Sequence, residues 1–193
     1  ILDFDLKEMC FGEHEELNLT EYTQPCMVSV CLAIVQELKK RGINPDITAG
    51  LSLGEYAAVA AAGGMNELDA IKLVRRRGIL MQSTVPAGEG AMAAVLGLDA
   101  KKIEEILESF ENVWIANYNC PGQLVITGEK SAVETAGSSL KEAGAKRVIL
   151  LNVSGPFHSP MMETAGQQLA RVLENVRLNQ PVIPYVSNVT ADF

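Results

Sequence analysis

The stretch Gly50-Leu51-Ser52-Leu53-Gly54 decides how this chain is interpreted. It follows a short apolar segment, residues 47–49, and opens a segment rich in small residues, 55–64, that is typical of a helix. A serine between two glycines at a sharp strand-to-helix turn is the pattern of a nucleophile elbow. Such a turn exposes the serine oxygen at a helix N-terminus, where the dipole and free N–H groups favour developing negative charge. We expect both glycines to let strand and helix approach closely. An ordinary Gly/Ser turn fits the bare pattern, and the strand–helix context favours the elbow.

Composition bounds the remaining possibilities. The 193 residues suffice for one large domain or two small ones, and a 48% hydrophobic content allows a real core. A net charge of −8 argues against a general nucleic-acid binder. No apolar run is long enough to span a bilayer, and no signal peptide is visible, so we expect a cytoplasmic protein with reduced thiols and no membrane association. The cysteines lack metal-ligand spacing and only two histidines accompany them, so no metal site is expected. These residues are Cys10, Cys26, Cys31, Cys120, His14 and His158.

Helical periodicity organises the first part of the chain. Residues 25–41 are predicted to form a helix, with Pro25 at its first position and Gly42 after its last. Asn66 is expected to cap a second helix that ends near residue 82, and a linker follows over 83–90. The chain begins at Ile1 rather than at Met, which suggests a piece of a longer protein.

The middle third changes rhythm. Strands are predicted at 91–98, 113–117, 124–127 and 147–153, and helices at 100–110 and 130–143. The resulting order, βαββαβ, is the ferredoxin-like pattern. We therefore expect an α/β protein in which residues 90–153 form a ferredoxin-like subdomain. Residues 1–89 and 154–193 would form the core that carries the elbow, with a helix at 160–175 capped by Ser159 and a strand at 182–187.

A serine nucleophile needs a base, and His158 is the better placed histidine. It lies in the rigid loop 154–160, just before a helix and at the expected junction of the two parts. A neutral imidazole there could take the Ser52 proton and return it to the leaving group. A loop histidine bonded to backbone is the alternative. His14 lies among glutamates and is most simply a surface residue.

Arg77 is the third chemical group. A helical wheel places it at the centre of an apolar stripe, whereas Arg75 and Arg76 point elsewhere. A guanidinium on an apolar face needs an anion, and its planar fork suits a carboxylate. That carboxylate could be an internal Asp or Glu, or it could belong to a substrate. A serine nucleophile with such an arginine would select an acyl group that carries a free carboxylate.

Five stretches in the same order identify a family. The chain resembles the malonyl-CoA:acyl-carrier-protein transacylases of fatty acid synthesis and the acyltransferase domains of polyketide synthases. The matching segments cover nearly the whole chain: GLSLGEY at 50–56, LVRRRGILMQ at 73–82, GAMAAVLG at 90–97, NYNCPGQ at 117–123 and GPFHS at 155–159.

The resemblance implies a fold and a reaction. The fold is an α/β-hydrolase-like core interrupted by a ferredoxin-like subdomain. Ser52 would accept the malonyl group from malonyl-CoA with His158 as base, and the phosphopantetheine thiol of acyl carrier protein would then take it. Arg77 would bind the malonyl carboxylate. The Leu53 N–H would stabilise the oxyanion. No metal or other cofactor is implied, and the oligomeric state stays open.

Two further residues and three departures from the family pattern refine these expectations. Met81 would line the pocket, and Phe157 before the histidine goes with malonyl rather than methylmalonyl. Leu51 replaces the usual histidine before the nucleophile, with little effect expected. The family's N-terminal Gly-Gln-Gly segment, which supplies a second oxyanion donor, and its C-terminal segment, which orients the histidine, are not found. We therefore expect this piece alone to be impaired, since losing an oxyanion donor costs roughly 10²–10³ in rate.

Two rival functions remain at this stage. A serine thioesterase or esterase would need no buried arginine, so Arg77 discriminates against it. A non-catalytic module that docks the carrier protein would form no serine adduct. Because carrier proteins of this family are acidic, docking would need a basic patch. Candidates are Arg75, Arg76, Lys146 and Arg147.

Overall fold

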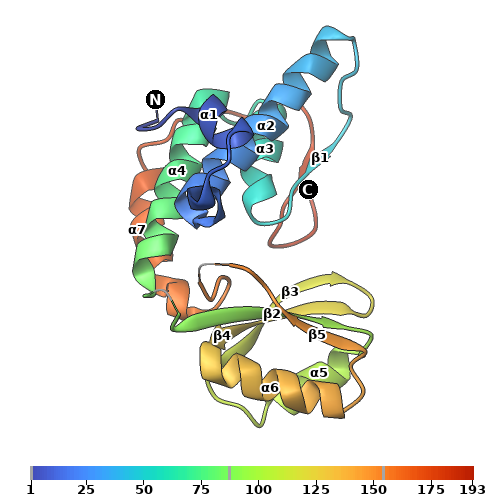
Figure 1. Cartoon of the computed structure of the whole chain (residues 1–193). Coiled ribbons are helices and arrows are strands. Elements are labelled where there is room, and N and C mark those ends of the chain that lie inside the picture. The colour runs from blue at the N-terminus through green and yellow to red at the C-terminus, as the bar shows by residue number, and fades with distance from the viewer. Residues whose placement is uncertain (1, 87, 154) are drawn as a thin grey trace. The chain divides into compact units, whose positions relative to one another are not determined.

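The computed structural model describes residues 2–86, 88–153 and 155–193, in a mixed arrangement of helices and strands (Figure 1). The chain forms two compact units. The first, here called the elbow unit, comprises the chain up to Leu80 together with Gln168–Phe193. The second, here called the sheet unit, comprises Met81–Gln167.

The elbow unit is mainly helical. Its core joins apolar side chains of α2, α3, α4 and α7, among them the almost fully buried Val28 and Val74. Helix α4 approaches α2 closely, because a Cβ at Gly78 would stand 2.7 Å from the Thr20 carbonyl oxygen. The elements of this unit, two of which continue past its boundary, are α1 Leu6–Phe11, η1 Glu15–Asn18, α2 Thr20–Lys40, β1 Thr48–Ala49, α3 Leu53–Ala61, α4 Glu67–Thr84, α7 Glu163–Leu173 and β6 Tyr185–Val186.

Two short strands bring the end of the chain to the elbow. Strand β6 pairs with β1 in parallel, with Thr48 opposite Tyr185 and Ala49 opposite Val186. Thr48 N also donates to the Pro184 carbonyl at 3.0 Å. The predicted strand over 182–187 is thus reduced to two residues. In a parallel pair the carboxyl ends of both strands lie at the same edge, so the residues after Val186 and those after Ala49 share that edge.

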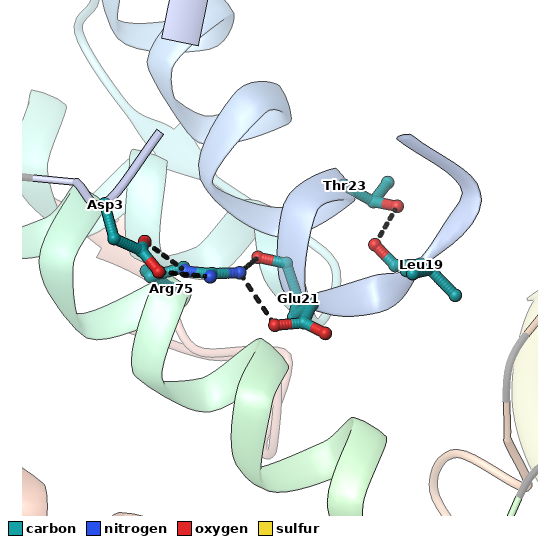
Figure 2. Close-up of polar contacts among 5 residues, drawn as sticks. All are labelled: Asp3, Leu19, Glu21, Thr23 and Arg75. Carbon is teal, nitrogen blue, oxygen red and sulfur yellow. Dashed lines mark hydrogen bonds and ion pairs between the residues drawn. The ribbon is translucent and has the colours of Figure 1, made fainter. Parts of the chain in front are cut away.

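Helix α2 begins earlier than the sequence predicted, and the reason is a side-chain contact. It starts at Thr20, so Pro25 lies inside it rather than at its first position. An interior proline lacks the N–H that would bond the carbonyl four residues earlier, here that of Glu21. Arg75 Nη1 donates to the Glu21 carbonyl oxygen at 2.8 Å instead (Figure 2). This contact from α4 fills the gap that the proline leaves.

The sheet unit is built on a four-stranded antiparallel sheet in the order β3-β4-β2-β5. Helices α5 and α6 cover one of its faces (Figure 1). Between them lies a core that includes Ile103, Ile126 and Leu140, all fully buried. The elements of this unit are β2 Gly90–Leu96, α5 Ala100–Leu107, β3 Val113–Cys120, β4 Gln123–Glu129, α6 Lys130–Glu142, β5 Arg147–Leu150 and η2 Pro160–Met162.

The described ranges contain neither a membrane-spanning helix nor a cluster of metal ligands. None of the helices there combines the length and apolar character that crossing a membrane requires. Those same ranges hold no group of three or more His, Cys, Asp or Glu side chains placed to bind a metal ion.

Candidate active site

Ser52 occupies a strained turn between β1 and α3. Its backbone has φ 49° and ψ −106°, a conformation that non-glycine residues rarely adopt. Gly50 makes this turn possible, because a Cβ there would stand 2.1 Å from the Gly54 carbonyl carbon. A Cβ at Gly54 would meet nothing within 4 Å among the described residues. The expectation that both glycines serve close packing is therefore wrong for Gly54.

The backbone N–H and the hydroxyl of Ser52 both have identified partners. Its N–H donates to Asn188 Oδ1 at 2.9 Å, and its Oγ accepts a hydrogen bond from Arg77 Nη2 at 3.2 Å. Leu53 is the first residue of α3. The N–H of a first helical residue has no partner within its helix. The serine oxygen thus lies at a helix N-terminus beside a guanidinium group.

Neutral groups hold Arg77 in place. Its Nη1 donates to Gln24 Oε1 at 2.7 Å, and Gln24 is only 4% exposed. The guanidinium carbon lies 5.5 Å from the centroid of the Tyr56 ring. Burial lowers the pKa of Arg77, partly offset by Tyr56, and burial also raises the pKa of Tyr56. An arginine nevertheless stays charged at neutral pH.

Among the described residues, no Asp or Glu lies within 4.0 Å of the Arg77 guanidinium, so no carboxylate there neutralises its charge. Of the two partners that the sequence left open, the internal carboxylate is therefore not observed. The site presents a half-buried cation next to a serine hydroxyl, which is an arrangement able to bind an anionic acyl group.

Arg75, a candidate for a basic docking patch, is buried in the structure. It is 8% exposed, and its guanidinium pairs with Asp3 Oδ2 at 2.9 Å and Glu21 Oε2 at 3.0 Å (Figure 2). It also lies over the rings of Phe4 and Tyr22, at 5.2 and 4.6 Å from their centroids. The proposal of Arg75 as part of an exposed basic patch is wrong, because this side chain ties the N-terminal segment and α2 to α4.

His158 lies in the sheet unit, in a tightly tied loop. Its backbone also has a positive φ, 60°. Phe157 N donates to the Gly155 carbonyl at 3.0 Å, and Ser159 Oγ donates to the Pro156 carbonyl at 2.6 Å. Ser159 and Pro160 stand at the predicted N-cap and first positions of the next helix, η2, but the Ser159 hydroxyl closes the loop instead of bonding a helix N–H. Backbone strain of this kind clusters at functional sites.

Two other predicted site residues also belong to the sheet unit. Met81 lies on α4 one turn beyond Arg77 and is half-buried. Phe157 is half-buried, directly before His158. A Cβ at Gly155 would stand 3.2 Å from its ring. Their roles as pocket residues stay predictions. His14 Nε2 lies 3.3 Å from Glu8 Oε1, within the elbow unit.

Sequence reasoning missed residues that surround Ser52 and Arg77. Gln24 and Tyr56 contact the guanidinium, and Asn188 contacts the serine. Asn188 also donates its backbone N–H to Glu55 Oε1 at 2.9 Å. The one available signal was positional, since Asn188 follows a predicted strand, and in α/β folds functional groups gather beyond the carboxyl ends of parallel strands.

A cavity of about 350 Å³ lies beside α3 in the elbow unit. Its lining includes Tyr56, Met65 and Leu173 but neither Ser52 nor Arg77. This cavity is therefore not the place where the serine oxygen and the guanidinium meet.

Comparisons with known proteins show which family the chain resembles. The Acyl transferase domain family matches residues 2–192. The malonyl CoA-acyl carrier protein transacylase of Bacillus subtilis is 46% identical over 99% of this chain and 62% of its own length. The protein of the same name from Haemophilus influenzae is 46% identical over 92% of this chain and 59% of its own length. The chain thus spans about three fifths of the length of the curated relatives it matches.

Solved structures similar to this chain carry the same kind of name as these relatives. A malonyl CoA-acyl carrier protein transacylase from Coxiella burnetii has a TM-score of 0.92 and 38% identity, over 96% of this chain and 60% of that one. A malonyl-transacylase in complex with its type II PKS acyl-carrier protein has a TM-score of 0.92 and 43% identity, over 98% and 63% of the two chains. With the family match extending over almost every residue, this chain belongs to the Acyl transferase domain family.

Proposed function

We propose that the protein transfers a malonyl group from malonyl-CoA to the phosphopantetheine thiol of acyl carrier protein, through a malonyl ester on Ser52, in fatty acid synthesis. The observation that carries this proposal is the Arg77 guanidinium, which lies 3.2 Å from Ser52 Oγ without a carboxylate partner among the described residues. Relatives named malonyl CoA-acyl carrier protein transacylases support the same substrate and acceptor.

The proposed chemistry has two matched halves. In the first, Ser52 Oγ attacks the thioester carbon while His158 takes the hydroxyl proton. The carbon–sulfur bond then breaks, and the proton passes to the departing CoA sulfur. In the second half the carrier's thiol gives its proton to His158 and attacks the serine ester. The ester bond breaks and Ser52 recovers its proton.

The remaining site residues have supporting roles in the proposal. The Leu53 N–H, at the start of α3, stabilises the negative oxygen of each tetrahedral intermediate. Arg77 binds the carboxylate of the acyl group and so selects malonyl over uncharged acyl groups. Met81 and Phe157 shape the pocket, with Phe157 leaving less room for an α-branch. No cofactor or metal takes part in this scheme.

The finer fold description belongs to the same proposal. We propose that residues 1–89 and 154–193 are part of an α/β-hydrolase-like core, and that residues 90–153 are a ferredoxin-like subdomain. The strand-turn-helix at Ser52 and the parallel pair β1–β6 support the first part. The order β2-α5-β3-β4-α6-β5 and the antiparallel sheet support the second. The free cysteines are consistent with a cytoplasmic protein.

Transfer to a carrier protein tests the proposal. Malonyl-CoA and holo acyl carrier protein are mixed with the protein, and both free CoA and malonyl-carrier are measured over time. The proposal predicts equal release of CoA and formation of malonyl-carrier. Without carrier, CoA release should stop after about one equivalent per active site. Continued CoA release without carrier would instead show a thioesterase.

A carrier of the polyketide type forms the second arm of this experiment. One solved relative is a malonyl-transacylase in complex with a type II PKS acyl-carrier protein. An acyltransferase of polyketide synthesis is therefore the alternative within the same family. A rate with the polyketide carrier well above that with the fatty acid carrier would favour this alternative.

A further inference from the structure

The nucleophile Ser52 and two further residues form a closed ring of hydrogen bonds. The Ser52 N–H donates to Asn188 Oδ1 at 2.9 Å. The Asn188 N–H donates in turn to Glu55 Oε1 at 2.9 Å. The Glu55 N–H returns to the Ser52 carbonyl at 3.2 Å. The ring therefore joins the elbow to a residue 136 positions later in the chain.

Asn188 is itself held by its surroundings. It follows β6, which is paired to β1 immediately before the elbow. Asn188 lies within a turn over 187–192 that two hydrogen bonds close, from Ser187 N to the Asp192 carbonyl at 2.8 Å and from Ala191 N to the Ser187 carbonyl at 2.9 Å. The Asn188 side chain that bonds Ser52 thus projects from a hydrogen-bonded turn.

The ring acts on a residue whose backbone conformation is strained. The φ of 49° at Ser52 costs free energy and persists only where neighbouring groups hold it. Asn188 holds Ser52 at its backbone N–H, and the Glu55 N–H holds it at its carbonyl. This backbone conformation directs where Ser52 Oγ lies relative to Arg77.

The ring also decides which N–H can stabilise an oxyanion. In some serine enzymes the N–H of the nucleophile itself is an oxyanion donor. Here that N–H is already bonded to Asn188 Oδ1. The next N–H, that of Leu53, is then the one that the elbow offers at the start of α3.

We infer that Asn188 is a positioning residue for the nucleophile: its side-chain oxygen fixes the Ser52 backbone, keeps the Ser52 N–H out of the oxyanion site and leaves that role to Leu53. The inference rests on the proposed function for its rate measurement and on the geometry alone for its exchange measurement. Glu55 supports Asn188 by accepting the hydrogen bond of its backbone N–H.

The test compares three variants of the purified protein. Asn188→Ala removes the acceptor, whereas Asn188→Asp keeps an oxygen in the same place. Asn175→Ala is the matched control, because Asn175 lies in the elbow unit and its side chain donates to the Arg171 carbonyl. The rate of Ser52 acylation is followed across malonyl-CoA concentrations, amide hydrogen exchange is measured on the peptide that contains Ser52, and thermal unfolding confirms that each variant is folded.

A positioning role predicts a specific pattern. Asn188→Ala should lower the maximal acylation rate about fivefold, which is the effect of one exposed hydrogen bond, with the half-saturating malonyl-CoA concentration nearly unchanged. The Ser52 amide should exchange faster in this variant. Asn188→Asp should recover part of the rate, and Asn175→Ala should match the unmodified protein in both measurements.

Other results overturn the inference or the proposed function separately. An Asn188→Ala protein that unfolds at lower temperature but acylates at the normal rate would make the ring a structural tie only. Unchanged amide exchange at Ser52 would overturn the inference as well. If the unmodified protein forms no malonyl adduct, the proposed function fails, and the exchange measurement still decides whether Asn188 holds the elbow.

Discussion

Replacing Arg77 with alanine should separate malonyl from acetyl as substrates. The guanidinium donates to Gln24 Oε1 at 2.7 Å and to Ser52 Oγ at 3.2 Å, and no carboxylate neutralises it among the described residues. Hydrogen bonds to charged groups contribute about 1.5–3 kcal/mol each. With Arg77 half-buried and partly reached by water, a two-point contact to malonyl should contribute about 3–4 kcal/mol. The acylation efficiency with malonyl-CoA should therefore fall roughly 10²–10³-fold.

The assay is single-turnover acylation of Ser52 with malonyl-CoA and, separately, with acetyl-CoA. Acetyl-CoA has no carboxylate, so its acylation efficiency should change little and the preference for malonyl should disappear. Arg77→Lys should fall between the two, because it keeps the charge but loses the planar fork. Arg76→Ala is the matched control, since this exposed neighbour should leave both rates unchanged. An unchanged malonyl-to-acetyl ratio in Arg77→Ala would refute the carboxylate-binding role.

Further predictions concern stability and reactivity. Gly50→Ala should lower the free energy of unfolding by about 1–3 kcal/mol in urea titrations, because its Cβ would stand 2.1 Å from Gly54, whereas Gly54→Ala should be close to neutral. Asp3→Asn should cost less than about 1 kcal/mol at neutral pH, since the Asp3 carboxylate is exposed. The hydrogen bond from Arg75 lowers the pKa of Asp3 below 3.8, so the carboxylate stabilises the fold above that pH. This contribution, and with it the difference between variant and unmodified protein, should disappear as the pH falls through the folded pKa. Burial raises the pKa of the Cys26 thiol to about 12, so iodoacetamide should label it only after unfolding, as peptide mass spectrometry would show.

The sequence predicted an element well where the element depends on residues that are near one another in the chain. The strand before Ser52, the helix after it and the Asn66 cap all follow from residues within a few positions, and the Asn66 side chain does accept from Leu68 N at 2.9 Å. The start of α2 was predicted wrongly because the preference of proline for the first helical position takes no account of contacts from other helices. Pro25 is accommodated by Arg75 from α4, a partner that no local rule could supply.

The same distinction applies to the site. Arg77 was found because helical periodicity exposes a charge on an apolar face. Asn188 was missed because its contact with Ser52 depends on the parallel pairing of two-residue strands, and two residues carry too little pattern to specify a register. Arg75 was misassigned because the carboxylates that bury it, on Asp3 and Glu21, lie more than 50 positions away in the chain.

The central claim is that Ser52 carries the malonyl group as an ester. The most direct measurement is peptide mass spectrometry of the protein after brief exposure to malonyl-CoA and acid quenching. The account predicts one added malonyl group on the peptide that contains Ser52, removed when holo acyl carrier protein is present before the quench, and absent from Ser52→Ala. A malonyl group found on another residue, or an equal adduct in Ser52→Ala, would contradict it.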